Sequence, residues 1–549
     1  MIITELQQLY ATHPNVEGMC KLLKDNSVRH LYCSGLCASA ASLFSSVLVQ
    51  QAECPFVFIL GDLEEAGYFY HDLTQILGTG QVLFFPSSFR RAIKYGQKDA
   101  ANEILRTEVL SRLQKGEEGL CVVTYPDALA EKVVSRKELG DKTLKLHAGE
   151  KVDMDFVTEV LRSYGFEYVD YVYEPGQYAV RGSIIDVFSF SSEFPFRIDF
   201  FGDEVESIRT FEVESQLSKE KKEEIVIVPD LSRSLEQGGD GGMVSFLDFL
   251  RPDTLLAMRD FLWLRERIQV VHDESLTAQA IAACEAEENG AISLEGKLID
   301  GGEFTLRALD FRRMEFGTKP TGTPDATVAF STVAQPIFHK NFDLVAESFR
   351  DYLSRNYTLY ICSDSLKQTD RIRAIFEDRG DNISFTPVER TLHEGFADDT
   401  LRLCIFTDHQ LFDRFHKYNL KSDKARSGKV ALSLKELNQF TPGDYVVHTD
   451  HGVGRFTGLV RIPNGDTTQE VMRLVYQNDD VVFVSIHSLH KVSKYKGKEG
   501  EAPRLNKLGT GAWEKLKDRT KTKIKDIARD LIKLYSQRRE EDRKSTRLN

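Results

Sequence analysis

Short apolar runs alternate with amphipathic stretches over the first 125 residues, and this alternation constrains the fold more than any other feature of the chain. The apolar runs lie at 28–35, 54–62, 80–88 and 119–126. They are rich in Val, Leu, Phe and Cys and are bounded by Gly, Pro or Ser, which is typical of buried parallel strands. Residues 38–51 and 100–116 lie between them and carry a helical pattern. We therefore predict an α/β layer fold with crossover helices.

The pattern changes further along the chain. Residues 150–212 hold strand segments separated by tight polar turns, which predicts an antiparallel β module. Another α/β unit is predicted at 340–435, and short strands after residue 440 indicate a small β-barrel. From Thr510 we expect a basic helix with one apolar stripe. Because 549 residues are too many for one hydrophobic core, the chain should be a multidomain α/β protein.

Composition excludes several classes of protein. Hydrophobic residues make up 41% of the chain and charged residues 28%, which is ordinary for a globular protein. No apolar run reaches the roughly 18–20 residues of a membrane helix, and the N-terminus lacks the blocks of a signal peptide. We therefore expect a cytoplasmic protein with no membrane partner. The eight cysteines form no CxxC pair, which predicts free buried thiols, and the net charge of −13 argues against a nucleic-acid coat.

One loop has the frame of a phosphate-binding loop without its chemistry. Residues 35–42 follow the first predicted strand and read Gly-Leu-Cys-Ala-Ser-Ala-Ala-Ser. A working loop reads G-x-x-x-x-G-K-[ST], because its lysine neutralises phosphate charge and its glycines let backbone N–H groups approach. Gly35 and Ser42 fit this pattern, whereas Ala40 replaces the second glycine and Ala41 replaces the lysine. We expect no ATPase activity here, and the alternative interpretation is an unrelated strand–turn–helix.

The run Phe-Arg-Ile-Asp-Phe-Phe at 196–201 places an aromatic side chain in polar company. Strict alternation assigns one apolar face of the strand to Phe196, Ile198 and Phe200. Phe201 then shares the other face with Arg197, and an aromatic residue beside an arginine is the composition of an interface hot spot. The alternatives are that both faces of the strand are covered, or that a bulge turns Phe201 away.

Residues 171–216 resemble the module with which the repair protein UvrB and the transcription-repair coupling factors (Mfd) bind UvrA. The matching positions, in order and spacing, are 181–182, 185–186 and 197–201. By this resemblance, the residues that contact UvrA are Arg181, Arg197 and Phe201. The loop at 35–42 is then similar to that of the first helicase-like domain of UvrB, emptied of its catalytic residues.

Residues 440–455 resemble the opening of the polymerase-interacting domain of the same family, which is related to CarD-type transcription regulators. The similarity continues through 471–495 and 505–517. By this resemblance, the β subunit of RNA polymerase is contacted at Val471, Met472, Arg473 and Leu474. An edge strand with a spare apolar face can add to a partner's sheet. The alternative is that both faces of this strand are packed within the protein.

Two His-x-x-His pairs, at 448–451 and 487–490, raise the question of a metal site. Residues three apart on a strand point to opposite faces, and no cysteine or carboxylate cluster supports either pair. We therefore expect no metal. The basic helix from Thr510 to about Arg539 resembles the family's connector to a DNA translocase, and phosphate contacts to nucleic acid are an alternative role.

The resemblance implies a non-catalytic adaptor, expected to be a monomer, that recruits UvrA and binds the RNA polymerase β subunit at stalled complexes. Family members continue into a translocase that uses ATP and Mg²⁺ and makes most DNA contacts, and into a C-terminal domain that masks the UvrA surface. We expect this chain to be truncated before both, to need no cofactor and to expose its UvrA surface. The alternatives are a stand-alone CarD-type transcription regulator and a UvrB-like helicase subunit.

These patterns and resemblances divide the chain into six expected segments. They are a degenerate P-loop-like α/β domain at 1–125, a UvrA-binding β-rich module at 126–215, the second part of a UvrB-like α/β module at 216–335, a small α/β domain at 336–436, a CarD-like polymerase-interacting β-barrel at 437–506, and a linker helix toward the missing translocase at 507–549.

Overall fold

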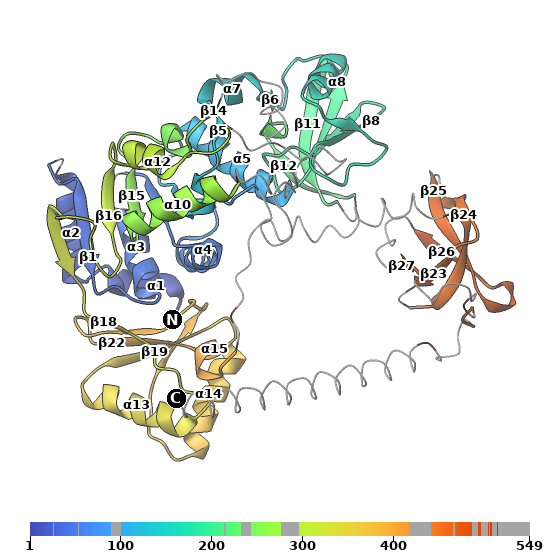
Figure 1. Ribbon diagram of the computed structural model, residues 1–549. Coiled ribbons are helices and arrows are strands. Elements are labelled where there is room, and N and C mark those ends of the chain that lie inside the picture. The colour runs from blue at the N-terminus through green and yellow to red at the C-terminus, as the bar shows by residue number, and fades with distance from the viewer. Residues whose placement is uncertain are drawn as a thin grey trace. The chain divides into compact units, whose positions relative to one another are not determined.

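The computed structural model of the chain describes residues 1–25, 27–52, 54–88, 100–213, 216–231, 243–275, 296–414, 416, 441–448, 450–464, 467–485, 492–495, 503, 505–507 and 513. The chain divides into two compact units (Figure 1). The first comprises residues 1–211 and 218–426, and the second comprises residues 212–217 and 427–549. Mixed α/β structure with several sheets, including an antiparallel module, confirms the predicted fold class at this level.

A seven-stranded parallel sheet lies at the centre of the first domain, which we define as residues 1–134 and 243–330. Its strands, in spatial order, are β17 (Ala326–Ala329), β1 (His30–Ser34), β16 (Arg312–Glu315), β15 (Leu255–Met258), β2 (Phe56–Ile59), β4 (Cys121–Thr124) and β3 (Val82–Phe84). The four strands predicted before residue 126 are confirmed, and each is paired in parallel. The chain leaves this sheet after β4 and returns to it with β15, β16 and β17.

Helices cover both faces of this sheet (Figure 1). Their bounds are α1 (Ile3–Tyr10), α2 (Pro14–Lys24), α3 (Ala40–Gln51), α4 (Leu63–Leu77), α5 (Ala100–Lys115), α6 (Pro126–Leu129), η1 (Phe246–Phe249), α10 (Phe261–Ser275) and α12 (Gly301–Ala308). The short helix α7 (Arg136–Asp141) follows residue 134 and lies outside this domain. A short pair of strands joins β5 (Val133–Val134) to β14 (Met243–Val244). The helix α3 is buried along residues 40–49, because small and apolar residues occupy every face of it. The helix α4 begins at Asp62, whose side chain accepts a hydrogen bond from the N–H of Glu65.

Residues 144–227 form the β module, in which most neighbouring strands are antiparallel as predicted. Its six-stranded sheet runs β12 (Ser218–Lys222), β11 (Glu204–Phe211), β10 (Phe196–Phe201), β9 (Ile184–Val187), β8 (Gln177–Arg181) and β7 (Glu167–Tyr168). Only the short β7–β8 pair in this sheet is parallel. The helix α8 (Met154–Ser163) and the strand pair β6 (Leu144–His147) and β13 (Glu224–Ile227) share one core with this sheet. The sheet therefore continues past residue 215, where the sequence pattern placed the end of the module.

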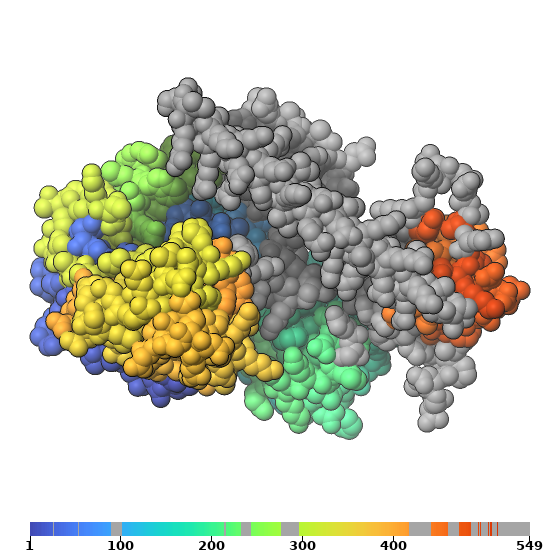
Figure 2. Space-filling view, turned by 90° about the horizontal axis from the view of Figure 1, so that it is seen from below, coloured from blue at the N-terminus to red at the C-terminus, as the bar shows by residue number. Residues whose placement is uncertain are grey.

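Residues 332–411 form another α/β domain. We call it the third domain, because it follows the first domain and the β module along the chain. Its sheet runs β18 (Thr332–Ala334), β21 (Phe396–Asp398), β22 (Leu403–Thr407), β19 (Thr358–Ser363) and β20 (Thr386–Glu389), with the helices α13 (Phe342–Ser354), α14 (Leu366–Asp378) and α15 (Asp408–Leu411). The α/β pattern predicted from residue 340 is confirmed by these strands and helices. Val388, Leu392 and Phe396 belong to the hydrophobic cluster of the first domain, and the two domains lie against each other in Figure 2, yellow to orange against blue.

The second unit contains a five-stranded antiparallel sheet. Its order is β26 (Val481–Ser485), β25 (Thr467–Val475), β24 (Gly452–Asn464), β23 (Tyr445–His448) and β27 (Val492–Lys494), with the short helix η2 (Gln477–Asp479) before β26. The short strands predicted after residue 440 are thus confirmed. The helix predicted from Thr510 lies outside the described residues, apart from Trp513. In the described part of the chain, no helix combines the length and hydrophobicity needed to cross a membrane.

Candidate functional site

Two arginines share one buried carboxylate in the β module. Asp186 of β9 is fully buried and lies directly opposite Arg197 of β10 in the strand register. It accepts hydrogen bonds from Nε of Arg197 at 2.8 Å and from Nη2 at 2.9 Å, and it also pairs with Arg181 of β8. The side chains of Arg181 and Arg197 remain 36% and 16% exposed. The structure thus brings the two predicted arginines together through a carboxylate that holds both in place.

Aromatic rings support both guanidinium groups. The guanidinium of Arg181 lies 4.9 Å from the ring centre of Tyr171, and that of Arg197 lies 4.6 Å from the ring centre of Phe211. Hydrogen bonding to Asp186 raises the pKa of Arg197 above its ordinary value. Each guanidinium is therefore a fixed positive charge whose orientation is set from two sides.

Phe201 projects from the same sheet and has an 80% exposed side chain. The residues predicted on the opposite face of β10 are all buried, namely Phe196, Ile198 and Phe200. A bulge lies beside Phe201, but its extra residue is Glu206 of β11, so β10 keeps its alternation. The prediction that Phe201 shares a face with Arg197 is confirmed, and neither a covered face nor a bulge within β10 hides it.

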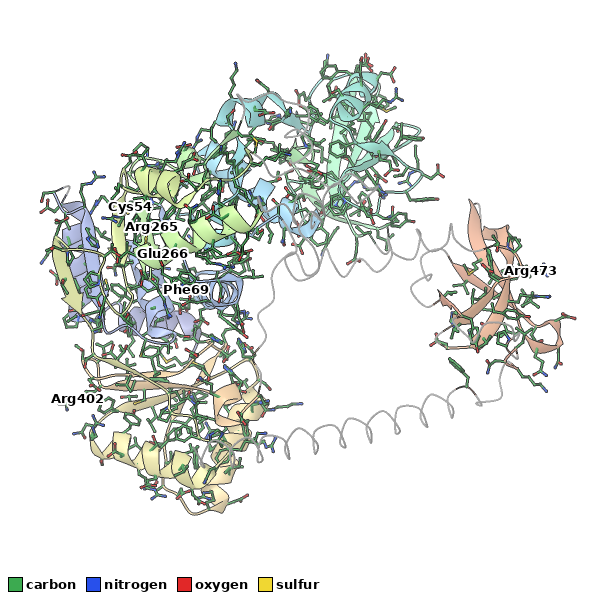
Figure 3. All side chains as sticks on the ribbon, in the orientation of Figure 1. Cys54, Phe69, Arg265, Glu266, Arg402 and Arg473 are labelled. Carbon is green, nitrogen blue, oxygen red and sulfur yellow. The ribbon has the colours of Figure 1, made fainter. Side chains whose placement is uncertain are left out.

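The predicted polymerase-binding residues lie on β25, which pairs with β24 on one side and with β26 on the other. The expectation of an edge strand is therefore wrong, because its backbone N–H and C=O groups are already engaged within the sheet. The side chains of Val471, Met472 and Leu474 are buried, as the alternative interpretation allows. Arg473 is exposed and is labelled in Figure 3. Its cross-strand neighbour on β26 is Phe483, which is 49% exposed.

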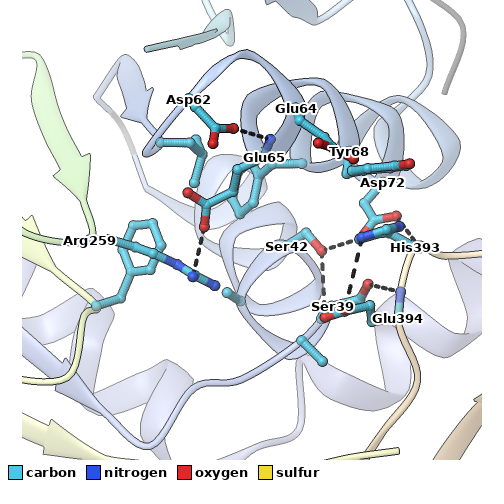
Figure 4. Close-up of a pocket in the computed structure, with 15 residues that line it drawn as sticks. Ser39, Ser42, Asp62, Glu64, Glu65, Tyr68, Asp72, Arg259, His393 and Glu394 are labelled. Atoms are coloured by element: carbon cyan, nitrogen blue, oxygen red, sulfur yellow. Dashed lines mark hydrogen bonds and ion pairs between the residues drawn. The ribbon is translucent and has the colours of Figure 1, made fainter. Parts of the chain in front are cut away.

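The loop at 35–42 connects β1 to α3, as its sequence predicts. Gly35 has φ +76°, and a Cβ atom there would lie 2.0 Å from the carbonyl oxygen of Phe330, so only glycine fits. Ala40 and Ala41 begin α3 and are buried. A cavity of about 320 Å³ lies beside the loop (Figure 4). Its lining carries five carboxylates, on Asp62, Glu64, Glu65, Asp72 and Glu394, together with Arg259.

His448 and His451 stack in the second unit, with ring centres 4.6 Å apart. Nδ1 of His448 accepts a hydrogen bond from the N–H of Asp450 at 3.1 Å. The expectation that the two histidines point to opposite faces is wrong, because β23 ends at His448 and His451 lies beyond it. The pair at 487–490 lies outside the described residues. In the residues that the structure describes, no group of three His, Cys, Asp or Glu side chains is arranged to hold a metal ion.

Asp186 and Phe483 were not predicted from the sequence as candidate site residues. The signal for Asp186 was a charged residue in the short run Ile-Ile-Asp-Val, where burial requires a cationic partner. The signal for Phe483 was its position between Val482 and Val484 on a strand. Because Val484 belongs to the core, alternation puts Phe483 on the opposite face of the sheet. Neither signal identifies the partner, because the cross-strand register is needed to place Arg197 or Arg473 opposite.

Two parts of the chain match known domain families. Residues 144–232 match the family described as UvrB interaction domain, and residues 440–496 match the family described as CarD-like/TRCF RID domain. The first match covers the β module, and the second covers the sheet of the second unit.

Two curated proteins are similar to this chain along nearly its whole length. The chain is 25% identical over 576 residues to a transcription-repair-coupling factor of Bacillus subtilis (strain 168), which covers 92% of this chain and 48% of that protein. A transcription-repair-coupling factor of Staphylococcus aureus (strain bovine RF122 / ET3-1) is 25% identical over 580 residues, with the same coverage. The chain spans about half the length of the curated relatives it matches. The two domain matches and the alignment along nearly the whole chain show that this chain is similar to the transcription-repair-coupling factors.

Proposed function

We propose that this chain is a non-catalytic adaptor that recruits UvrA through the β module and binds the β subunit of RNA polymerase through the sheet of the second unit. The similarity to transcription-repair-coupling factors and the two domain matches support a coupling role. The observation that carries the proposal is the 80% exposed Phe201 on the same sheet as two arginines fixed on Asp186. Aromatic and arginine side chains are the residues that dominate the energy of protein–protein interfaces.

The exposure of Phe201 favours a binding role over a structural one. Burying a phenylalanine side chain stabilises a protein by roughly 1.5–3 kcal/mol, and Phe201 contributes little of this to its own fold. Its neighbours on the strand, Ile198 and Phe200, supply the core instead. A partner that covers Phe201 gains this burial, while the preset guanidiniums of Arg181 and Arg197 lose little side-chain entropy on binding.

The UvrA contact is tested with the whole chain in a binding titration against UvrA. Phe201→Ala and Arg181→Ala should each weaken binding at least about tenfold, which corresponds to about 1.4 kcal/mol. Phe156→Ala is the matched control, because Phe156 is a 52% exposed phenylalanine of the same module that lies on α8. The contact is refuted if UvrA binds the wild-type chain and both variants equally well.

For RNA polymerase, the sheet suggests a contact centred on Arg473 and Phe483. The strand β26 is at the edge of the described sheet and carries Phe483, so it can add to a partner's sheet by backbone pairing. The predicted residues Met472 and Leu474 would then act from beneath, because they hold β25 in the core. Val471 is also buried, but it alternates with them and so shares the face of Arg473.

Phe483→Ala should weaken binding of the polymerase β subunit about tenfold or more, since it removes an exposed aromatic side chain at the proposed contact. Tyr495→Ala is the control in the same unit, because Tyr495 is a 36% exposed aromatic residue after β27. Equal affinity of the wild-type chain and the Phe483→Ala variant would remove this contact from the proposal. Binding of polymerase without UvrA would instead favour a stand-alone transcription regulator.

A further inference from the structure

The loop between β1 and α3 is hydrogen-bonded to the third domain. The N–H of Glu394 donates to Oγ of Ser39 at 2.9 Å, and the N–H of Ser39 donates to the carbonyl oxygen of Glu394 at 3.4 Å. The N–H of His393 donates to Oδ1 of Asp72 at 2.7 Å, and Oγ of Ser42 donates to Oδ2 of the same carboxylate at 2.7 Å (Figure 4). Two consecutive backbone N–H groups of the third domain are therefore bound by side chains of the first domain.

A second set of hydrogen bonds joins the loop to Thr332 of the third domain. The N–H of Cys37 donates to Oγ1 of Thr332 at 3.0 Å, and the same hydroxyl donates to the carbonyl oxygen of Gly35 at 2.6 Å. Thr332 is the first residue of β18, which opens the third domain. The backbone N–H groups of Cys37 and Ser39 are thus engaged by Thr332 and Glu394.

Apolar and aromatic contacts surround these polar ones. Leu392, next to His393, is fully buried in the hydrophobic cluster of the first domain. The ring of His393 stacks on that of Tyr68 of α4, with centres 3.5 Å apart and planes 12° apart. The connection between β20 and β21 is therefore seated by shape as well as by hydrogen bonds.

The charge around the loop is opposite to that of a phosphate site. A phosphate-binding loop offers N–H donors and a lysine, whereas this site offers the buried carboxylate of Asp72 as an acceptor. Burial raises the pKa of Asp72 to about 6, and Glu64 and Glu65 lie in the same cavity lining. Arg259 is the cation there, and it is paired with Glu65 at 2.7 Å. The residues present do not fit a nucleotide.

We propose that residues 35–42, with Asp72, form a docking socket for residues 392–395 of the third domain, and that this internal occupant takes the place of a nucleotide. The socket binds two backbone N–H groups, those of His393 and Glu394, which donate to Asp72 and Ser39. The buried side chain of Leu392 anchors the same segment. The socket joins the first and third domains into one folded body. The inference does not depend on UvrA or on RNA polymerase.

The test measures backbone amide hydrogen exchange at His393 and Glu394 in the whole chain. Asp72→Ala should accelerate exchange at His393 by about tenfold or more, because it removes the acceptor of that N–H. Glu64→Ala is the matched control, since Glu64 is a carboxylate of the same helix and the same cavity lining without a described bond to His393. Ser39→Ala is the milder variant, and it should accelerate exchange at Glu394 alone.

Two results would overturn the inference. Exchange at His393 and Glu394 that stays unchanged in Asp72→Ala and in Ser39→Ala would show that these side chains do not hold the segment. Micromolar binding of Mg-ATP to the wild-type chain with unchanged exchange at both amides would show that nucleotide and the segment do not compete for the loop. The expected results are accelerated exchange in the variants and no binding of Mg-ATP by calorimetry.

Discussion

At the scale of single residues, Asp186 carries the arrangement of the proposed UvrA surface. Its carboxylate is fully buried and compensates two guanidiniums at once. Asp186→Asn leaves Arg181 and Arg197 without their shared anion. We expect it to lower the free energy of unfolding by about 2 kcal/mol, less than for a fully buried pair because both arginines are partly exposed.

Urea unfolding of the variant and of the wild-type chain measures this effect. Glu206→Gln is the control, because Glu206 is the exposed extra residue of the bulge on β11, and its change should stay within about 0.5 kcal/mol. Equal stability of Asp186→Asn and Glu206→Gln would show that the buried carboxylate does not stabilise the module.

At the scale of secondary-structure elements, the turn from β1 into α3 depends on Gly35. Its φ of +76° alone costs another residue about 1–2 kcal/mol. A Cβ atom would also meet the backbone of Phe330 at 2.0 Å, and backbone cannot move aside as a side chain tip does. Gly35→Ala should therefore lower the free energy of unfolding by at least about 2 kcal/mol more than the conformational cost alone.

The matched control for this prediction is Gly165→Ala. Gly165 has φ +77°, and nothing lies within 4 Å of a Cβ atom built there, so only the conformational cost applies. Chemical unfolding of both variants gives the difference directly. Similar losses of unfolding free energy in Gly35→Ala and Gly165→Ala would contradict this prediction. They would mean that the backbone of β17 and Phe330 moves to make room for the added methyl group.

At the scale of the whole molecule, a group of histidines lies where α4 meets the third domain. His71 of α4 and His416 have ring centres 5.0 Å apart, and His409 of α15 stacks on His416 at 4.4 Å. Burial lowers the pKa of His71 to about 4, that of His393 to about 3 and that of His409 to about 4. These imidazoles are neutral when folded, so the stability they contribute is present above pH 6.5 and is lost as pH falls toward 4.

The measurable consequence is a difference between variants in their pH dependence. Between pH 6.5 and 4.5 the wild-type chain should lose about 2 kcal/mol more free energy of unfolding than His71→Gln, which has no imidazole to protonate there. The comparison is needed because burial raises the pKa of Asp72 to about 6 and that of Glu103 to about 7, which acts in the opposite direction. Equal pH dependence of the wild-type chain and the His71→Gln variant would contradict this prediction.

The local sequence pattern was sufficient to predict those structural features that depend only on residues close together in the chain. Alternation in residues 196–201 predicted which side chains face the core of the module, because successive residues of a strand point to opposite faces. The strands β1, β2, β3 and β4 of the first domain were predicted for a similar reason, since a buried parallel strand must be apolar throughout. The polymerase contact was harder, because whether β25 is an edge depends on β26, and the register that pairs Arg473 with Phe483 is not encoded in either strand alone.

By itself, the sequence determined the alternation of strands and helices, the exposed aromatic residue at Phe201 and the altered loop at 35–42. Only the tertiary structure decided what these residues touch. Ser39 and Glu394 are 355 positions apart, and Asp72 meets His393 across 321. Such partners depend on how whole domains pack, because hydrogen bonds and ion pairs act over a few ångströms in space and carry no trace in the spacing of the residues that form them.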